Sequence, residues 1–303
     1  MVKLIRNATA VLILLLILGT SCSTSPEEED LQKSFLWEAK SDGTTVYILG
    51  SVHLAKAELY PLDDTIEDAY AQSQILVVEI NMNDENLVKT EKFLLEKGVY
   101  PAGEKLQNNI TDELYSSVSE KAMEFDSSGL LLVSLNMFEP WVVAVVITDM
   151  EYMELGYEVE YGIETYFLDK AENDGKDILE LETVELQLDI FDGLSPELQI
   201  MMLEDAVENP VTEEELELMY DAWSNGDTTQ MEQLLFEDID ENPEYRPFYD
   251  KIIDERNLQM VEKIEDYLED DDVYFVIVGA AHLLGENGIV NLLIERGYSV
   301  SQR

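Results

Sequence analysis

The stretch Tyr47-Ile-Leu-Gly-Ser-Val-His53-Leu54 decides the fold, because its pattern recurs near the other end of the chain as Phe275-Val-Ile-Val-Gly-Ala-Ala-His282-Leu283. Each copy is a short apolar run followed by Gly-x-x-His and Leu, and these are the only two histidines among 303 residues. A short, continuously apolar run bounded by glycine is typical of a strand buried in a parallel sheet. The two phrases therefore predict two buried strands, each followed by a histidine.

The order of elements after each histidine is also the same. A helix over Pro61–Ser73 and a buried strand over Ile75–Ile80 follow His53, and the strand is apolar apart from Glu79. A helix over about Glu286–Glu295 and a short strand from Tyr298 follow His282. This order predicts two βαβ-like units, one at each end of the domain.

The rest of the chain adds a hairpin and a mainly helical middle. Phe35–Ala39 and Thr45–Leu49, joined through Gly43, predict a β-hairpin. Asp177–Glu182 predicts one further short strand. Apolar residues at three- and four-residue spacing predict helices over Asp84–Leu95, Asp112–Phe125, Pro140–Leu155, Gly162–Asn173, Pro196–Val207, Glu213–Ser224 and Tyr245–Leu268. We therefore expect an α/β fold, with a mixed, largely parallel sheet built from two βαβ-like units and a large helical insertion. No Gly/Ser-rich linker divides the chain, so residues 35–303 are expected to form one domain.

The first 22 residues have the features of an export signal. Lys3 and Arg6 precede the apolar stretch Ala10–Leu18, which is too short to span a bilayer, and small residues lead to Cys22, the only cysteine. We expect a cell-envelope lipoprotein that faces the extracytoplasmic side, held to the membrane by a lipid on Cys22, with residues 23–34 as an acidic tether. An uncleaved or conventionally cleaved signal is the alternative.

The net charge restricts the partners of the protein. The chain has 18 Lys and Arg against 66 Asp and Glu, a formal net charge of −48. Nucleic acid is excluded as a partner, because binding it needs clustered cations. Anionic lipid headgroups should also repel the domain. The acidity fits either a high-salt habitat or an ordinary solvated surface, and the sequence leaves both open along with the oligomeric state.

The paired histidines are the first candidates for chemistry. The carboxyl ends of parallel strands open on one edge of a sheet, where ligands normally bind. If the two strands are parallel neighbours, His53 and His282 converge there, and Gly50 and Gly279 allow close approach of the backbone to a substrate. Two imidazoles and a carboxylate make a minimal site for a divalent metal ion. The alternative is that each histidine only caps its strand and bonds to backbone.

Three further residues are candidates. Glu79 lies near the end of a buried strand, where a charge is unfavourable unless it is paired or coordinated, so we expect it to be the third metal ligand or a catalytic acid. Glu182 ends the middle strand and could shuttle a proton. Arg256 and Asn257 could bind a substrate carbonyl or carboxylate, with Arg256 stabilising an oxyanion. The alternative for each charged residue is a structural ion pair.

From about Phe35 to Val300 the chain resembles the TraB/PrgY/GumN family, which includes the Tiki proteins. The resemblance is carried by Leu49-Gly-Ser-Val-His53-Leu54, Val77-Val-Glu79-Ile80, Pro140-Trp141, Gly162-Ile-Glu164 with Ala171, Leu181-Glu182-Thr183 with Gln187, Arg256-Asn257, Val278-Gly-Ala-Ala-His282-Leu283 and Arg296-Gly-Tyr-Ser-Val300. It implies an α/β fold with both histidines and a glutamate at one site. One departure is Glu164, which stands where the family often has Asp, so no role is assigned to it.

The resemblance implies a chemistry for the site. Tiki-type members are regarded as peptidases that depend on a divalent ion such as manganese or cobalt, and PrgY-type members limit the activity of peptide pheromones. We therefore expect a metal-dependent hydrolase acting on a peptide or protein substrate, with manganese, cobalt or zinc at His53, His282 and Glu79. Two alternatives stay open: a protein that binds and sequesters peptides without cleaving them, and a metal-independent hydrolase with a histidine as general base.

Overall fold

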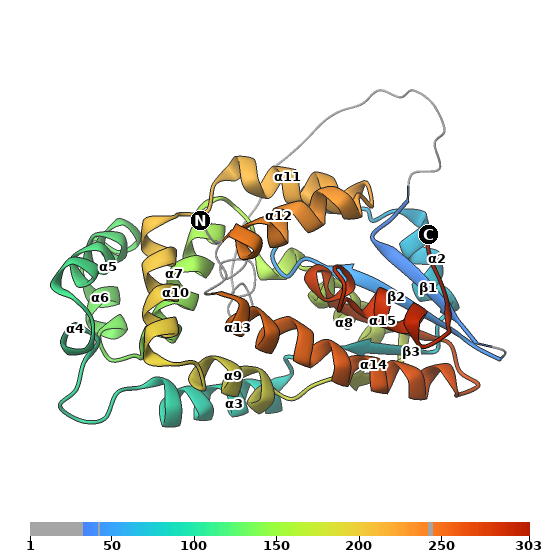
Figure 1. The fold of residues 1–303 in the computed structure, drawn as a ribbon, viewed down its shortest axis with the longest axis horizontal. Helices are drawn as coiled ribbons and strands as arrows, with labels where there is room; N and C mark the ends of the chain where they lie inside the picture. Colours follow the sequence, from blue (N-terminus) through green and yellow to red (C-terminus); the bar gives the residue numbers. More distant parts are fainter. Residues whose placement is uncertain (1–32, 42, 242–244) are drawn as a thin grey trace.

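The computed structural model describes residues 33–303, apart from residue 42 and residues 242–244 (Figure 1). The predicted export signal at residues 1–22, including Cys22, lies outside the described residues, as does most of the predicted tether at residues 23–34. Among the described residues, no helix is both long enough and apolar enough to cross a bilayer.

One six-stranded sheet organises the described chain, in the order β4-β3-β5-β2-β1-β6. The strands are β1 (Leu36–Lys40), β2 (Thr45–Ser51), β3 (Ile75–Val78), β4 (Asp177–Glu180), β5 (Tyr274–Gly279) and β6 (Ser299–Gln302). Strands β4, β3, β5 and β2 run parallel, β1 is antiparallel to β2, and β6 is antiparallel to β1. The predicted fold class, a mixed and largely parallel sheet with many helices, is confirmed.

Fourteen α-helices are found in the described residues. They are α2 (Asp64–Gln72), α3 (Asp84–Phe93), α4 (Leu106–Asn109), α5 (Asp112–Phe125), α6 (Leu130–Leu135), α7 (Pro140–Glu154), α8 (Ile163–Asp174), α9 (Val184–Asp192), α10 (Pro196–Glu208), α11 (Glu213–Ser224), α12 (Thr228–Glu241), α13 (Arg246–Tyr249), α14 (Glu255–Leu268) and α15 (Ile289–Glu295).

The two βαβ-like units are β2–α2–β3 and β5–α15–β6. In each unit the two strands point the same way, but other strands lie between them in the sheet: β5 separates β2 from β3, and β2 and β1 separate β5 from β6. The units are thus interleaved, and their first strands, β2 and β5, are direct neighbours. This interleaving brings the two Gly-x-x-His phrases to one edge.

Helices cover the sheet on both sides, with α8 behind it and α14 and α15 in front (Figure 1). Aromatic packing holds α2 and α8 against the sheet. The ring centroid of Phe275 on β5 lies 5.7 Å from that of Tyr70 on α2 and 5.0 Å from that of Phe167 on α8. On α14, Met260 and Val261 are fully buried. All six residues of β5 are buried, which explains its uniformly apolar sequence.

Two expected helices differ clearly from the structure, and other helices were not expected. The helix expected over Tyr245–Leu268 is divided by a π turn at Asp250–Asp254 between α13 and α14. The last helix starts at Ile289 rather than near Glu286, because Gly288 before it is extended. Helices α4, α6, α9 and α12 were not expected, and α9 carries residues of the site. A π turn inside a helix frequently marks a functional position.

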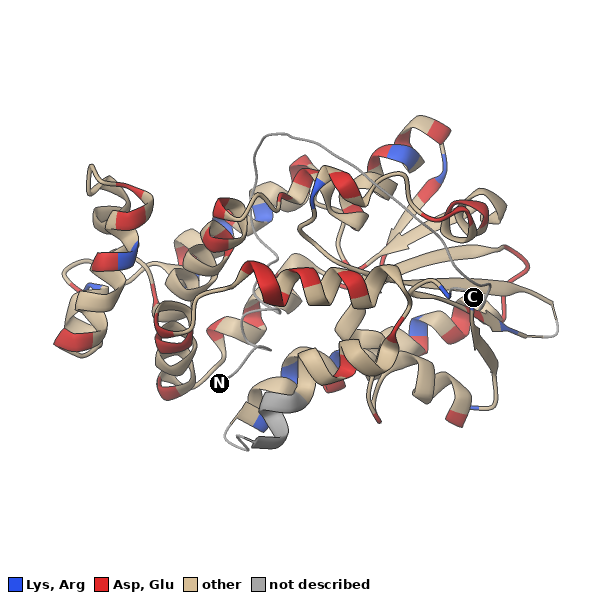
Figure 2. Ribbon diagram, turned by 90° about the horizontal axis from the view of Figure 1, so that it is seen from above, with Lys and Arg blue, Asp and Glu red and all other residues tan. Residues whose placement is uncertain are grey.

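Acidic residues are spread over the helices throughout the described chain, and basic residues are few (Figure 2). The acidic residues thus lie mainly on the helices, whereas the central strands β3 and β5 are apolar.

Candidate active site

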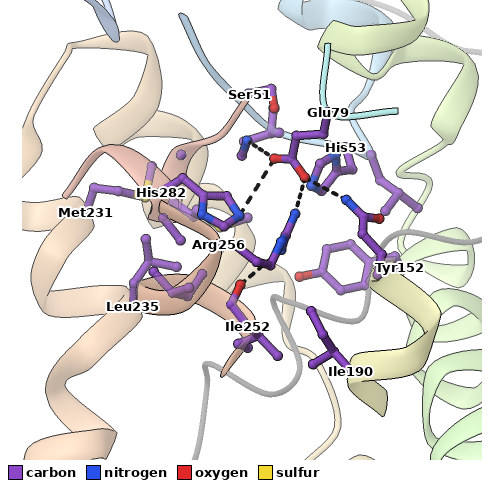
Figure 3. Close-up of a pocket in the computed structure, with 18 of the residues that line it drawn as sticks. Ser51, His53, Glu79, Tyr152, Ile190, Met231, Leu235, Ile252, Arg256 and His282 are labelled. Atoms are coloured by element: carbon purple, nitrogen blue, oxygen red, sulfur yellow. Dashed lines mark hydrogen bonds and ion pairs between the residues drawn. The ribbon is translucent and has the colours of Figure 1, made fainter. Parts of the chain in front are cut away.

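The two histidines leave the sheet side by side. Ser51 on β2 pairs with Gly279 on β5 in a parallel register, and each strand ends at that point. A Cβ atom placed on Gly279 would lie 3.4 Å from Nε2 of His53, 3.5 Å from Oε1 of Glu79 and 3.6 Å from Cδ2 of His282. The three side chains therefore surround one small space above Gly279, as expected for convergence at the carboxyl edge (Figure 3).

His282 is held as a neutral ring with one nitrogen facing this space. It lies in a short 3₁₀ turn, and its Nδ1 is 2.6 Å from Oδ1 of Asn257. The Asn257 amide nitrogen donates to the carbonyl oxygen of Asn287 (2.8 Å), so its oxygen must face the ring and Nδ1 carries the proton. Burial and the charge of Arg256 lower the pKa of His282 to about 3. Its Nε2 is thus a free lone pair, 3.7 Å from Oε1 of Glu79.

His53 is held by Glu164, the residue to which the sequence assigned no role. Nδ1 of His53 is 2.8 Å from Oε1 of Glu164, and the Ser51 hydroxyl donates to the same oxygen. Burial acts to lower the pKa of His53, but the charge of Glu164 and the hydrogen bond to it outweigh burial and raise that pKa to about 9. Gly162, at the start of α8, allows this contact, because a Cβ atom there would be 2.1 Å from the His53 carbonyl oxygen.

Glu79 and Glu182 form a buried ionic cluster with Arg256, and Figure 3 shows the pair of Glu79 and Arg256. Nη2 of Arg256 lies 2.5 Å from Oε2 of Glu79 and 2.6 Å from Oε2 of Glu182, and its Nε donates to Oε1 of Glu182 at 2.9 Å. The Gln187 amide nitrogen of α9 donates to both carboxylates, at 3.0 and 2.9 Å. Burial acts to raise the pKa of Glu79, but Arg256 and the histidines outweigh burial and lower that pKa to about 2. Both acids are therefore held by cationic and amide donors.

Two residues expected to bind substrate lie behind the site instead. Asn257 is completely buried, and both ends of its amide are bonded within the protein, so its observed contact is with His282. Gly50 is covered by Phe35, whose Cδ1 would be 2.5 Å from a Cβ atom at this position. Of Gly50 and Gly279, only Gly279 lines the pocket over the site. Asn257 and Gly50 therefore support the site through packing and orientation.

A pocket lies over this cluster, with a polar floor and apolar walls (Figure 3). It contains about 950 Å³ of empty space, part of which is open to solvent. His53, Glu79, Arg256, Gly279 and His282 lie on the floor. The walls come from α7, α9, α11, α12 and the π turn and include Tyr152, Ile190, Phe191, Met219, Tyr220, Met231, Leu235, Ile252 and Ile253.

The donor set at this floor fits a divalent ion in its chemistry. Each histidine has its Nδ1 held by a carboxylate or amide oxygen and its other nitrogen toward the pocket, which is how metal-ligating histidines are oriented. Two imidazole nitrogens and one carboxylate oxygen suit manganese, cobalt or zinc. Within the described ranges, however, no three His, Cys, Asp or Glu side chains are grouped closely enough to form a ready set of metal ligands. The carboxylate of Glu79 is held by Arg256 instead.

Several residues at this site had no sequence signal of their own. Ser51 lies inside the first Gly-x-x-His phrase, and Gln187 entered only through the family resemblance. Tyr152 and Tyr220 come from helices whose apolar spacing is that of ordinary core, so nothing in the sequence separates them from other tyrosines. Only the packing of α7 and α11 over the sheet edge shows that they line the pocket.

These features define an α/β protein with two histidines, a glutamate and an arginine at the carboxyl edge of a parallel sheet, beneath an apolar-walled pocket. The chain belongs to the TraB/PrgY/gumN family, whose model matches residues 35–302. The resemblance seen in the sequence is thereby confirmed.

Relatives with curated names fall into two groups. The uncharacterized protein YbaP of Escherichia coli (strain K12) is 25% identical, over 82% of this chain and 87% of that protein. Metalloprotease TIKI1 of Xenopus tropicalis is 23% identical, over 93% of this chain and 64% of that protein. The Metalloprotease TIKI homolog of Amphimedon queenslandica is 22% identical, over 96% of this chain and 66% of that protein. No solved structure matches the chain.

Proposed function

We propose that this protein is a membrane-tethered, extracytoplasmic, metal-dependent hydrolase that cleaves peptides. The observation that carries the proposal is the meeting of two acceptor atoms, Nε2 of His282 and Oε1 of Glu79, at 3.7 Å with no proton to share. A lone pair facing a carboxylate oxygen is favourable when a cation lies between them. The relatives named Metalloprotease TIKI1 support the same reading.

In this proposal His53, His282 and Glu79 would hold the ion, which is manganese, cobalt or zinc. When bound, the ion supplies a Lewis acid and lowers the pKa of water toward neutrality, so that the water can attack a carbonyl carbon. Asn257 and Glu164 keep the two rings turned so that Nε2 faces the pocket.

The carboxylates have separate tasks. Glu79 lines the pocket and takes the proton that the attacking water loses, whereas Glu182 lies behind it and anchors Arg256. Arg256, expected from sequence to contact the substrate, has its Nε and Nη2 on the two glutamates. Its task in the proposal is to hold both acids ionised in a buried site.

The substrate is a peptide with apolar side chains. The pocket walls carry Ile, Leu, Met and aromatic groups, which favour apolar side chains beside the bond to be cleaved. The net charge of −48 disfavours acidic peptides by long-range repulsion.

Metal analysis combined with peptide turnover tests the proposal. The protein is stripped of metal with EDTA and reloaded with Mn²⁺, Co²⁺ or Zn²⁺. Bound metal is then counted by mass spectrometry, and cleavage of quenched fluorescent peptides is followed. We expect at least one ion to bind and restore cleavage, and His53→Ala or His282→Ala to abolish both. The surface variant Lys97→Ala, which removes an exposed ion pair with Asp192, serves as the control and should change neither.

Three outcomes separate the alternatives. If no ion binds above background, the metal site is wrong, and cleavage that persists in EDTA would support a histidine as general base. If metal binds but no peptide is cut with any of the three ions, a non-catalytic peptide-binding protein is supported.

The proposed lipid anchor needs its own test, because Cys22 lies outside the described residues. Cys22→Ser should move the protein from the membrane fraction into the soluble extracytoplasmic fraction. Membrane association that survives this substitution would show that the anchor is not a lipid on Cys22.

A further inference from the structure

Tyr220, near the end of α11, presents a hydroxyl group that the fold leaves unused. Tyr220 lines the same pocket as His53, Glu79 and His282. The hydroxyl oxygen is buried and has no hydrogen-bond partner among the described residues. A buried hydroxyl without a partner is destabilising, and when it faces a pocket it is available to a ligand.

The packing of Tyr220 sets where this hydroxyl lies. The ring packs against Tyr157, with centroids 4.9 Å apart and planes at 35°. Burial first, and then the neighbouring Tyr152, Tyr157, Tyr60 and Glu164, raise the pKa of Tyr220 well above 10. The group is therefore a neutral O–H donor. Glu164, the last of these neighbours, also contacts Nδ1 of His53, so Tyr220 and His53 share a neighbour as well as the pocket.

The donors of Arg256, Gln187 and Gly279 at or behind the floor are engaged by carboxylates. Nε and Nη2 of Arg256 bind the two glutamates, and the side-chain nitrogen of Gln187 bridges the same pair. The backbone N–H of Gly279 donates to Oε1 of Glu79 at 2.7 Å. An attack on a carbonyl needs a donor for the oxygen that becomes negative, and Tyr220 has such a donor free.

We propose that the Tyr220 hydroxyl donates a hydrogen bond to the carbonyl oxygen of the peptide bond that is cleaved, and that it stabilises the oxyanion formed there. This inference rests on the proposed peptidase function. In the step concerned, the water oxygen bonds to the carbonyl carbon, the water proton passes to Glu79, and the C=O π electrons move onto the oxygen. When this intermediate collapses, the C–N bond breaks and the amine nitrogen takes the proton from Glu79. Tyr220 neither gains nor loses a proton.

Tyr220→Phe tests the proposal, because it removes only the hydroxyl and keeps the ring on Tyr157. We expect kcat/KM for peptide cleavage to fall by about 10²- to 10³-fold, the usual effect of removing one oxyanion donor. The loss should lie in kcat, with KM changed less than about threefold. The Tm should stay the same or rise by roughly 1–3 °C, because an unsatisfied buried hydroxyl is lost from the folded state.

Tyr70→Phe is the matched control. Tyr70 lies on α2, outside the pocket, and is also buried. Its hydroxyl, however, has a partner, because it lies 3.1 Å from Oδ2 of Asp174. We expect this variant to lose stability and to keep full activity. The two variants should therefore move stability and activity in opposite ways.

The outcomes separate this inference from the proposed function. If the wild type cleaves and Tyr220→Phe retains kcat/KM within threefold, or if its Tm falls by several degrees, Tyr220 is structural and the inference is overturned. If the wild type cleaves no peptide with any ion, the proposed function fails. The dissociation constant of a capped Ala-Leu-Leu-Ala amide then decides the donor role alone: a weakening of about fivefold or more in Tyr220→Phe supports carbonyl binding, and an unchanged value overturns it.

Discussion

Replacing Arg256 by Met should destabilise the protein severely and in a pH-dependent manner. Arg256 is the cation that compensates two buried carboxylates, because its Nη2 contacts Oε2 of both Glu79 and Glu182. Removing one partner of a buried ion pair leaves an uncompensated charge, which typically costs about 3–5 kcal/mol.

The lowered pKa of Glu79 gives a similar value for the loss of folding free energy. The pKa of Glu79 is lowered from 4.5 to about 2, against burial, with Arg256 as the largest opposing cause. At about 1.36 kcal/mol per pKa unit, that difference corresponds to roughly 3 kcal/mol of stability at neutral pH from this one carboxyl. Without Arg256, burial raises the pKa above 4.5, so the variant loses this contribution and also has a buried charge that opposes folding.

The sign of the pH dependence follows from the two pKa values. In the wild type the contribution of Glu79 is present above pH 4.5 and is lost as the pH falls through about 2. In Arg256→Met the raised pKa makes the ionised carboxyl unfavourable at pH 7, and protonation relieves it as the pH falls. The stability deficit should therefore be at least about 3 kcal/mol at pH 7 and should shrink markedly toward pH 4.

Urea denaturation of metal-free protein, followed by tryptophan fluorescence, measures this deficit. Arg246→Met is the control, because its side chain is 49% exposed and its pairs with Asp250 and Asp254 should contribute less than about 1 kcal/mol. Adding Glu79→Gln to Arg256→Met should recover part of the loss. A deficit below about 1 kcal/mol at pH 7, or one that does not change with pH, would refute the assignment of Arg256 as the compensating cation.

Three further predictions concern the groups that hold the histidines. Asn257→Leu should lower Co²⁺ or Zn²⁺ affinity by about 10- to 100-fold in calorimetric titration, because His282 loses the acceptor on Nδ1; an unchanged affinity would contradict that role. Gly162→Ala should lower Tm and peptide turnover together, because the new methyl group would meet the His53 carbonyl oxygen; normal Tm would show that α8 can shift freely. In metal-free protein, the ion pair of His53 with Glu164 contributes stability that is complete below pH 6.5 and is lost as the pH rises through about 9. In Glu164→Gln this contribution is absent, so the decrease of Tm between pH 6.5 and 9 should be smaller than in the wild type. A Tm profile equal to that of the wild type would exclude the pair.

The sheet could be predicted from sequence because its signals are local. Val46–Leu49 in β2 and Tyr274–Val278 in β5 are apolar runs followed by glycine, and burial on both faces imposes that pattern wherever a strand lies inside a parallel sheet. The convergence of His53 and His282 followed from the common direction of such strands, and it needed only the pairing of β2 with β5. Two rare residues in one repeated context gave a signal that ordinary residues cannot give.

The carboxylates and donors around the histidines could not be predicted in the same way. With 66 acidic residues, a single Glu164 or Glu182 has no local feature that separates it from solvated surface. Their roles depend on contacts between segments far apart in sequence, such as Arg256 with Glu79 across 177 positions. The π turn before Arg256 and the hydroxyl of Tyr220 likewise become visible only once the helices are packed over the sheet edge.

The acidity of the chain connects its composition to its site. A net charge of −48 produces a negative potential that draws divalent cations toward the molecule, and screening weakens this attraction as salt rises. At the pocket floor, Arg256 neutralises part of the local negative charge, while Nε2 of His282 and Oε1 of Glu79 remain opposed acceptors. The long-range field would therefore concentrate cations without selecting among them, and in the proposed metal site the two imidazole nitrogens would supply the preference for a transition metal over calcium or magnesium. Metal loading of the wild type should accordingly be faster at low than at high ionic strength, whereas the preference between Co²⁺ and Mg²⁺ should not depend on salt; a salt-dependent preference would place selectivity in the surface charge rather than in the two imidazoles.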